Sequence, residues 1–307
     1  MTETASLFAT AQSLNAQVYV LGDPAQVKDL PGALLFKSGR AICLLDGEAE
    51  VEAVAPHLIR IDAANYQRAG EWLNQHAARA PCATVLISPT SLEVLASHLR
   101  SFVDVMLPDR TIMALAFWDP NILAALNGAR GDDTLHVRGP VFVPAQTHAF
   151  LAPILQWWYW DRNGRLQQLN GGQDSVPEPT PSIKTPLLLD QHQVDALVEA
   201  SVPDNILHFI RLNMPGLLLR VPEPEQYPFV RSQIVRARLY NIEGTGDLVN
   251  YCCLALAYGE SFDKQPDVAI LLEQVKARVL TFENLMNEFP RDIPEVGNPL
   301  PIHPVTE

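Results

Sequence analysis

The hydrophobic residues of this chain are spaced in two different ways before and after about residue 169. In the first part, short apolar or alternating runs that are typical of strands come between longer segments with helical spacing. The runs that predict strands are residues 17–21, 33–36, 41–46, 57–62, 82–87, 111–118, 155–160 and 165–169. Helical spacing is found at 64–79, after Ser91, at 120–126 and at 145–154. Strands mixed with helices predict an α/β (α+β) N-terminal lobe with a mixed sheet.

The helix that follows Ser91 and the run after it carry the most distinct pattern. An apolar side chain recurs at three- and four-residue steps, which predicts an amphipathic helix. These side chains are Leu92, Leu95, Leu99 and Phe102. Thr90 and Ser91 can cap its first turn. Residues 111–118 are apolar on both faces, so we expect them to form a central strand.

After a proline-rich segment the spacing becomes helical. Residues 170–186 hold four prolines and two glycines and little that is apolar, which predicts a linker. Helical patterns follow at 190–201, 204–213, 226–241, 246–258 and 267–289. The predicted organisation is an α/β domain over 1–169, a linker over 170–186, an all-α helical lobe over 187–289 and a proline-rich tail over 290–307.

Two segments combine unusual composition with a possible role in binding a partner. Trp157, Trp158 and Trp160 stand in the strand before Asn163-Gly164, a strong signal for a hairpin turn. Alternation places Trp157 on one face and Trp158 and Trp160 on the other. We favour packing within the protein over partner binding, although Trp often anchors interfaces.

The second segment is 215–230, where four prolines bracket Leu217, Leu218 and Leu219. Proline prevents a continuous helix over these residues. The segment is either a crossover buried between helices or an exposed apolar ledge that holds an extended segment of a client protein.

Composition excludes several classes of partner. The net charge is −13, which repels nucleic-acid backbones and suits a partner with a basic patch. No apolar run approaches the about 20 residues of a membrane span, and the first residues do not resemble a signal peptide. The four cysteines fit buried free thiols in a reducing cytosol. We therefore expect a cytoplasmic protein that binds neither nucleic acid nor membrane.

The sequence contains no recognisable catalytic motif. Glycine-rich phosphate loops, Gly-x-Ser-x-Gly and His-Glu-x-x-His are all absent. We expect no catalytic residue, no cofactor and no metal. Asp46 and Asp119 each end an apolar run and could meet as an acid/base or metal pair, which leaves an enzyme as one alternative. We favour a structural role for both, because such carboxylates more commonly bond turn amides or cap a helix.

A series of short motifs resembles a known family of bacterial proteins. In chain order the motifs are Leu44-Leu45-Asp46-Gly47, Ala55-Pro56-His57-Leu58-Ile59, the helix around Trp72, the strand before Ser88, Leu92 with Leu95, His98-Leu99-Arg100, Leu107-Pro108-Asp109, Phe117-Trp118-Asp119-Pro120 and Gly139-Pro140-Val141-Phe142. Their order over about residues 18–165 resembles the type VI secretion effector chaperones, also called adaptors. Two arginines that often flank the Trp-Asp-Pro motif in that family are replaced by Ala116 and Asn121.

The resemblance implies a cytoplasmic, non-catalytic loading factor. Such proteins bind the N-terminal region of a toxin effector and escort it to a VgrG-type spike protein. An immunity protein, which neutralises a toxin by blocking its active site, remains a further alternative.

Overall fold

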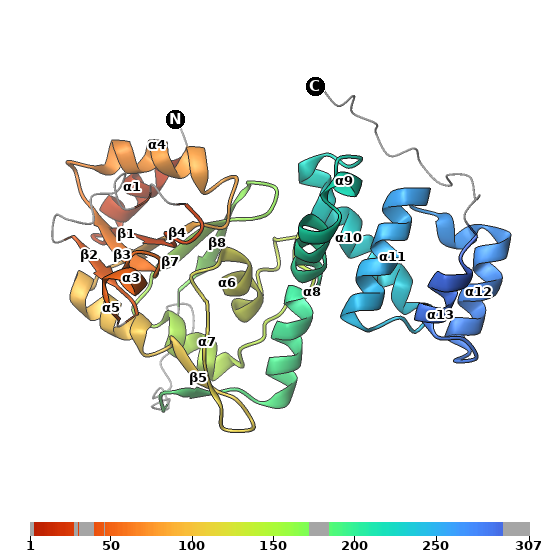
Figure 1. Cartoon of the computed structure of the whole chain (residues 1–307). Helices are drawn as coiled ribbons and strands as arrows, with labels where there is room; N and C mark the ends of the chain where they lie inside the picture. Colours follow the sequence, from red (N-terminus) through yellow and green to blue (C-terminus); the bar gives the residue numbers. More distant parts are fainter. Residues whose placement is uncertain (1–2, 28–29, 31–39, 46, 172–183, 291–307) are drawn as a thin grey trace. The chain divides into compact units, whose positions relative to one another are not determined.

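The computed structural model describes residues 3–27, 30, 40–45, 47–171 and 184–290, and it divides into two compact units, Met1–Ala200 and Ser201–Glu307 (Figure 1). The first unit is built on β-sheet with helices and the second is helical. The predicted fold class, an α+β lobe followed by an all-α lobe, is confirmed. No helix in the described part of the chain is long and apolar enough to cross a membrane.

A six-stranded sheet forms the centre of the first unit. Its strands are β1 (Gln17–Gly22), β2 (Ala41–Cys43), β3 (His57–Ile61), β4 (Ala83–Ser88), β7 (Gln156–Trp160) and β8 (Leu166–Asn170). They lie in the order β2-β3-β1-β4-β7-β8, and every neighbouring pair is antiparallel. The strand predicted at 33–36 lies outside the described residues.

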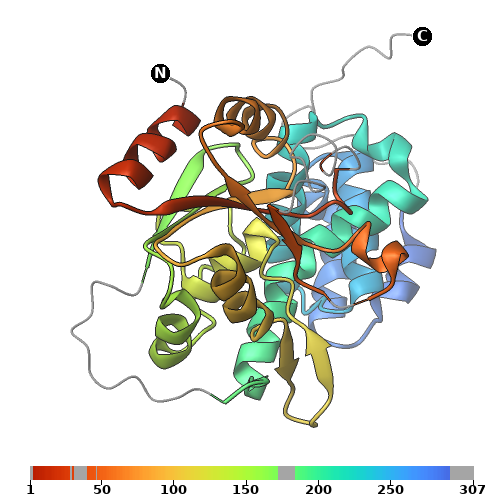
Figure 2. The ribbon, with the colours of Figure 1, turned by 90° about the vertical axis from the view of Figure 1, so that its left-hand side faces the viewer.

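Both faces of this sheet are covered by helices, which explains why its strands are apolar on both sides. One face packs against α1 (Glu3–Ser13) and α4 (Tyr66–His76), where Val20, Val85 and Trp160 point. The other packs against α5 (Leu92–Arg100), α6 (Pro120–Asn127) and α7 (Pro144–Leu151), where Tyr19 and Trp157 point. The two helix layers are visible on either side of the sheet in Figure 2. A short helix, α3 (Ala49–Glu52), precedes β3.

The prediction of a central strand over 111–118 was wrong. Only β6 (Ile112–Ala114) is extended there, and it is an exposed edge strand of a second, three-stranded sheet with the order β6-β5-β9. The partners are β5 (Asp104–Met106), antiparallel to β6, and β9 (Leu187–Leu188), parallel to β5. The run is apolar on both faces because Leu115 and Phe117, beyond the strand, turn into the core.

The hairpin predicted at Asn163-Gly164 is confirmed. Strands β7 and β8 pair across it, and Gly164 has φ +70, the left-handed conformation that glycine adopts without strain. The predicted alternation of the tryptophans also holds, but the face with Trp158 and Trp160 packs under α1 and α4. Both faces of β7 are therefore used inside the first unit.

The chain returns to the first unit after the predicted linker, most of which (172–183) lies outside the described residues. Strand β9 pairs with β5, and Leu187 and Leu189 are buried in the core beneath α5 to α7. The helical lobe had been predicted to begin at 187, whereas the compact units divide at Ala200. Pairing of β9 with β5 places residues 187–200 with the sheet. The predicted tail, 290–307, lies outside the described residues except for Pro290.

The helices of the second unit differ from the prediction in two places. The elements are α8 (Gln191–Asn213), whose first turns belong to the first unit, α9 (Pro215–Leu218), α10 (Glu223–Arg238), α11 (Thr245–Tyr258), a 3₁₀ turn η3 (Phe262–Lys264), α12 (Pro266–Lys276) and α13 (Phe282–Glu288).

Two short helices had been predicted where α8 is continuous. Pro203 lies inside it and removes a backbone donor, but Ile206, Leu207 and Ile210 are buried in one core and hold the helix together. Conversely, the long helix predicted at 267–289 is broken. Arg278 has φ +60, and the Thr281 hydroxyl accepts from the Asn284 amide to start α13.

A buried carboxylate joins several elements of the second unit. Asp263 in η3 pairs with the Arg236 guanidinium of α10 and accepts hydrogen bonds from the hydroxyls of Tyr240 and Tyr251, at 3.4 and 3.3 Å. Burial raises the pKa of the Tyr251 hydroxyl and the charge of Asp263 raises it further, so this hydroxyl remains a donor. The network fixes η3 against α10 and α11.

Candidate functional site

The His-Leu-Arg motif of α5 fastens this helix to its neighbours. His98 Nε2 lies 2.8 Å from the Phe150 carbonyl of α7, and because a carbonyl only accepts, this nitrogen carries the proton. The Arg100 guanidinium donates to the Cys43 carbonyl of β2, at 2.6 Å from Nη2. Leu99, between them, is fully buried. All three motif residues thus connect α5 to the sheet and to α7.

The Trp-Asp-Pro motif begins α6. The Asp119 carboxyl caps the helix by accepting from the Asn121 amide at 2.7 Å, and Pro120 occupies the first turn, where it loses no hydrogen bond. Trp118 is partly buried with its ring edge-on to Phe117. The favoured interpretation of Asp119 as a helix cap is confirmed. Asp46, its suggested catalytic partner, lies outside the described residues.

An aromatic cluster is centred on Phe150. Its ring centroid lies between 5.2 and 5.6 Å from those of four other aromatic side chains. These are Phe102, Phe117, Phe142 and Trp157. Most contacts are edge-to-face, the geometry favoured by aromatic quadrupoles. Phe117 and Phe142, from two of the motifs, therefore meet in a packed core, whereas Trp72, from another motif, packs on the opposite face of the sheet.

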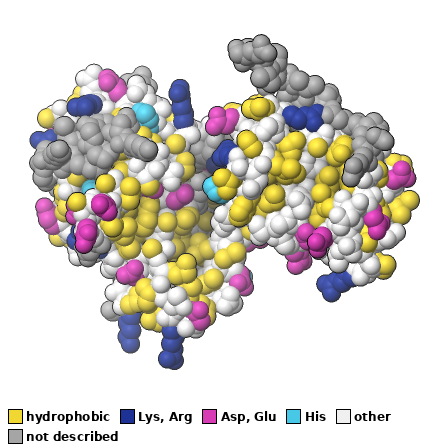
Figure 3. Space-filling view, in the orientation of Figure 1, with side chains coloured by type: hydrophobic (Ala, Val, Ile, Leu, Met, Phe, Trp, Pro, Cys, Tyr) yellow, Lys and Arg dark blue, Asp and Glu magenta, His cyan; other side chains and the backbone are white. Residues whose placement is uncertain are grey.

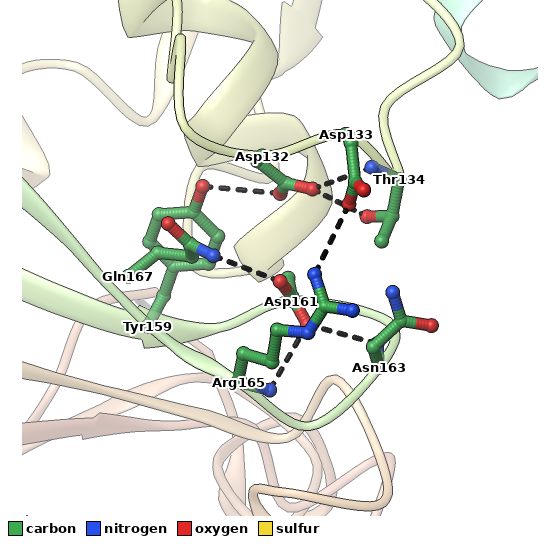
Figure 4. Close-up of polar contacts among 8 residues, drawn as sticks. All are labelled: Asp132, Asp133, Thr134, Tyr159, Asp161, Asn163, Arg165 and Gln167. Carbon is green, nitrogen blue, oxygen red and sulfur yellow. Dashed lines mark hydrogen bonds and ion pairs between the residues drawn. The ribbon is translucent and has the colours of Figure 1, made fainter.

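The structure also brings together three carboxyl groups that the sequence analysis did not single out. Asp132, Asp133 and Asp161 each offer an oxygen, and these oxygens lie within 4.8 Å of one another (Figure 4). Asp132 and Asp133 belong to the loop after α6, and Asp161 follows β7. The only sequence signals were the Gly-Asp-Asp-Thr run and the Asp that starts the hairpin turn.

The two buried carboxyl groups of this cluster are occupied by donors of the chain itself. Asp132 accepts from the Thr134 amide, the Thr134 hydroxyl and the Tyr159 hydroxyl, at 2.9, 2.6 and 3.1 Å. Burial raises the pKa of the Tyr159 hydroxyl, and the Asp132 charge raises it further, so the hydroxyl remains a donor.

Asp161 accepts from the amides of Asn163 and Arg165 and from the Gln167 side chain, at 2.9, 3.0 and 2.8 Å. Exposed Asp133 faces the Arg165 guanidinium at 3.6 Å. Carboxyl oxygens that accept hydrogen bonds from the amides of a turn stabilise that turn. We therefore assign the cluster a structural role in the β7–β8 hairpin and the neighbouring loop.

The tryptophans predicted for partner binding lie mostly inside the first unit. Trp157 is fully buried and donates to the Thr84 hydroxyl at 2.9 Å, and Trp160 is buried on the opposite face. Trp158 is partly buried, with its indole N–H bonded to Gln156 at 3.1 Å. These positions match the packing interpretation. A role in partner binding stays a prediction for Trp158, the one of the three that retains exposed surface.

The three leucines of the predicted ledge have different environments. Leu218 is buried in the core of the second unit, Leu217 packs partly against it and Leu219 is 65% exposed. Close in the chain, at the end of α8, three more large apolar side chains are exposed: Phe209, Leu212 and Met214. Figure 3 shows hydrophobic side chains on the drawn face of the helices of this unit. The exposed apolar residues therefore lie mainly before the ledge that the sequence suggested.

One region of the chain is similar to a known protein family. Residues 18–137 match the model of a domain of unknown function (DUF4123). No curated protein and no solved structure matches the chain. The matched region runs from β1 past α6 and contains the motifs of α5 and α6, but it covers less than half of the chain and excludes β7, β8 and the helical unit.

The environment of His98 predicts a loss of stability in acid. Burial lowers the pKa of the folded-state imidazole below its ordinary value of 6.5, so the unfolded chain binds this proton more readily. The contribution of His98 to the free energy of unfolding is complete above about pH 6.5 and declines as the pH falls below it. We expect His98→Gln to reduce the difference in unfolding free energy between pH 7.5 and 5.5. Exposed His192→Gln is the control; an equal reduction there would contradict the assignment.

Leu218 and Leu219 offer a matched pair of substitutions in the second unit. Leu218→Asp places a charge in the core and should cost more than about 4 kcal/mol, which is enough to unfold this unit. Leu219→Asp, on the exposed neighbour, should change the unfolding free energy by less than about 0.5 kcal/mol. Denaturant unfolding followed by circular dichroism measures both. Equal stability of the two variants would show that Leu218 is not part of the core.

Asp161 and Asp133 allow the carboxyl cluster to be tested. Asp161→Ala leaves two backbone amides and one side-chain amide without their acceptor, so we expect a loss of about 3 kcal/mol in the free energy of unfolding. Asp133→Ala removes an exposed ion pair and should cost less than about 0.5 kcal/mol. If the cluster instead holds a cation, millimolar Ca²⁺ or Mn²⁺ would raise the Tm of the wild type and not that of either variant.

Proposed function

We propose that this chain is a non-catalytic adaptor of a type VI secretion system, which binds the N-terminal region of a toxin effector in the cytoplasm and delivers it to a VgrG-type spike protein. The observation that carries the proposal is the match of residues 18–137 to DUF4123, a family associated with type VI secretion adaptors. The order of short motifs over the same region agrees with it.

The use of polar side chains in the first unit favours binding over catalysis. A catalytic pair needs ionisable groups that converge on a reacting atom and remain available to it. Here the motif histidine donates to a backbone carbonyl, the motif arginine donates to another, and the motif aspartate caps a helix. These interactions commit the three side chains to the backbone of the fold, which supports a role in binding over one in catalysis.

Exposed apolar side chains supply surface for a protein client. They include Leu212 in the last turn of α8, at 68% exposure, and Leu219 directly after α9, at 65%. Apolar side chains that stand together on a surface commonly mark a protein-binding site. The net charge of −13 keeps copies of the chain apart and favours a client segment with basic residues.

If a toxin is encoded in the neighbouring genes, as the proposal expects, co-expression with it tests the function. We expect the toxin to co-purify with the chain, to lose this association when its N-terminal region is removed, and to fall in abundance when the adaptor gene is deleted. A toxin that stays soluble and reaches the spike in the deletion strain would refute the proposal. Binding through the toxin's catalytic domain instead would identify an immunity protein.

Two exposed positions of the second unit refine this experiment. If the end of α8 and α9 contacts the client, Leu219→Asp should reduce the recovered toxin several-fold at unchanged adaptor stability. Val279→Asp, at a residue 78% exposed between α12 and α13, is the matched control and should leave recovery unchanged.

A further inference from the structure

The second edge of strand β6 is open. Strand β6 pairs with β5, and within the described part of the chain no strand pairs with its other side. All three of its residues are exposed, including Ile112 at 48% and Met113 at 53%. Figures 1 and 2 show the β5–β6 hairpin projecting from the first unit. An exposed apolar edge strand is a template for pairing with another chain.

The register of the hairpin identifies the backbone groups that face this open edge. Leu107 donates to the Thr111 carbonyl, and Leu115 donates to that of Val103. Hydrogen-bonded and non-bonded pairs alternate along an antiparallel ladder, so the N–H and C=O groups of Ile112 and Ala114 point away from β5. The same alternation turns Met106 toward β9, and its carbonyl does accept from Leu189 at 2.9 Å.

The opposite edge of this small sheet is covered, which makes the open side of β6 distinctive. The Gln146 side chain donates to the Leu188 carbonyl of β9 at 3.2 Å, and it accepts from Gln193 at 2.6 Å. Two helices, α7 and α8, thereby supply side chains that close the β9 side. Natural sheets commonly protect an edge in this way.

The outer face of the sheet presents one apolar row and one acidic group. Residues directly opposite one another share a face, so Met106, Ile112 and Leu188 form a row across the three strands. Leu188 is 59% exposed and Met106 is partly exposed. On the same face, exposed Asp104 lies opposite Ala114, whose small side chain covers little of the surface between Asp104 and the open edge.

We propose that β6 binds an extended segment of a partner protein as an added strand, with an apolar residue opposite Ile112 and an arginine or lysine opposite Ala114. The partner backbone bonds to the outward groups of β6, and its apolar side chain continues the row over Ile112. Its basic side chain reaches across Ala114 toward Asp104. Strands lie about 4.8 Å apart, so the basic residue and Asp104 are separated by about 10 Å between Cα atoms, within the combined reach of the two side chains.

Charge favours this occupant. The turn between β5 and β6 carries Asp109 and Arg110, one charge of each sign, so Asp104 is the charge that the strands themselves present. The net charge of −13 attracts a basic segment over a longer range. A second copy of the chain would bring the same acidic surface and is disfavoured. This inference goes beyond the loading function, because it specifies a docking mode that needs no knowledge of the effector.

Titration of the full-length ¹⁵N-labelled chain with synthetic peptides tests the proposal. The probe is acetyl-Thr-Arg-Thr-Val-Thr-Arg-Thr-amide, whose symmetric order allows either strand direction. We expect saturable shifts and slowed hydrogen exchange at the amides of Ile112 and Ala114. A peptide with glutamate in place of both arginines should bind about threefold more weakly. Methylation of alternate backbone nitrogens in the arginine peptide should abolish binding.

Substitutions distinguish the contribution of the Asp104 charge to peptide binding from that of backbone pairing with β6. Asp104→Asn should remove the preference for the arginine peptide, whereas Asp109→Asn, on the same hairpin, should keep it. Unchanged amide signals of Ile112 and Ala114 at millimolar peptide would overturn the proposal. So would equal binding of the arginine and glutamate peptides, or a dimer in analytical ultracentrifugation that Ala114→Lys dissociates. None of these measurements uses the effector, so failure of the loading function leaves the peptide result standing, and the reverse is also true.

Discussion

The packing around Phe150 is the constraint on which the first unit depends. Its ring contacts four aromatic rings from separate parts of the chain, and its carbonyl accepts a hydrogen bond from the His98 imidazole. Helix α5, the chain before α6, the loop before α7 and strand β7 all meet at this residue. Protein interiors tolerate few voids, so a change in any of these segments displaces the others. His98, Phe117 and Phe142, which the sequence motifs contain, take part in this arrangement.

This use of residues has a functional implication. His98, Arg100 and Asp119 are the residue types of an active site, yet each satisfies a backbone group and thereby orients a helix. These three side chains are committed to backbone groups, whereas the described surface carries exposed apolar side chains and, at β6, a strand edge with which no described strand pairs. Surface of this kind is suited to contact with another protein.

The sequence predicts well those features that depend on residues close together in the chain, and predicts poorly those that depend on contacts between distant residues. Local signals were sufficient for the Ser91 cap, whose hydroxyl accepts from the Val94 amide, and for the turn at Gly164. Hydrophobic patterns gave the wrong secondary structure where packing against distant residues determines it. The run over 111–118 is apolar for two different reasons, because it contains an exposed edge strand and then side chains that enter the core. Pro203 is accommodated within α8 because side chains of the following turns are buried. The carboxyl cluster was missed because Asp132 and Asp161 meet only in the folded chain.

The return of the chain through β9 means that the first unit is assembled from two stretches, one ending near Gly171 and one beginning near Lys184. Leu187 and Leu189 of the later stretch are held by hydrophobic burial, and Leu187 also by strand pairing. Severing the backbone in the interval would leave fragments able to complement one another non-covalently.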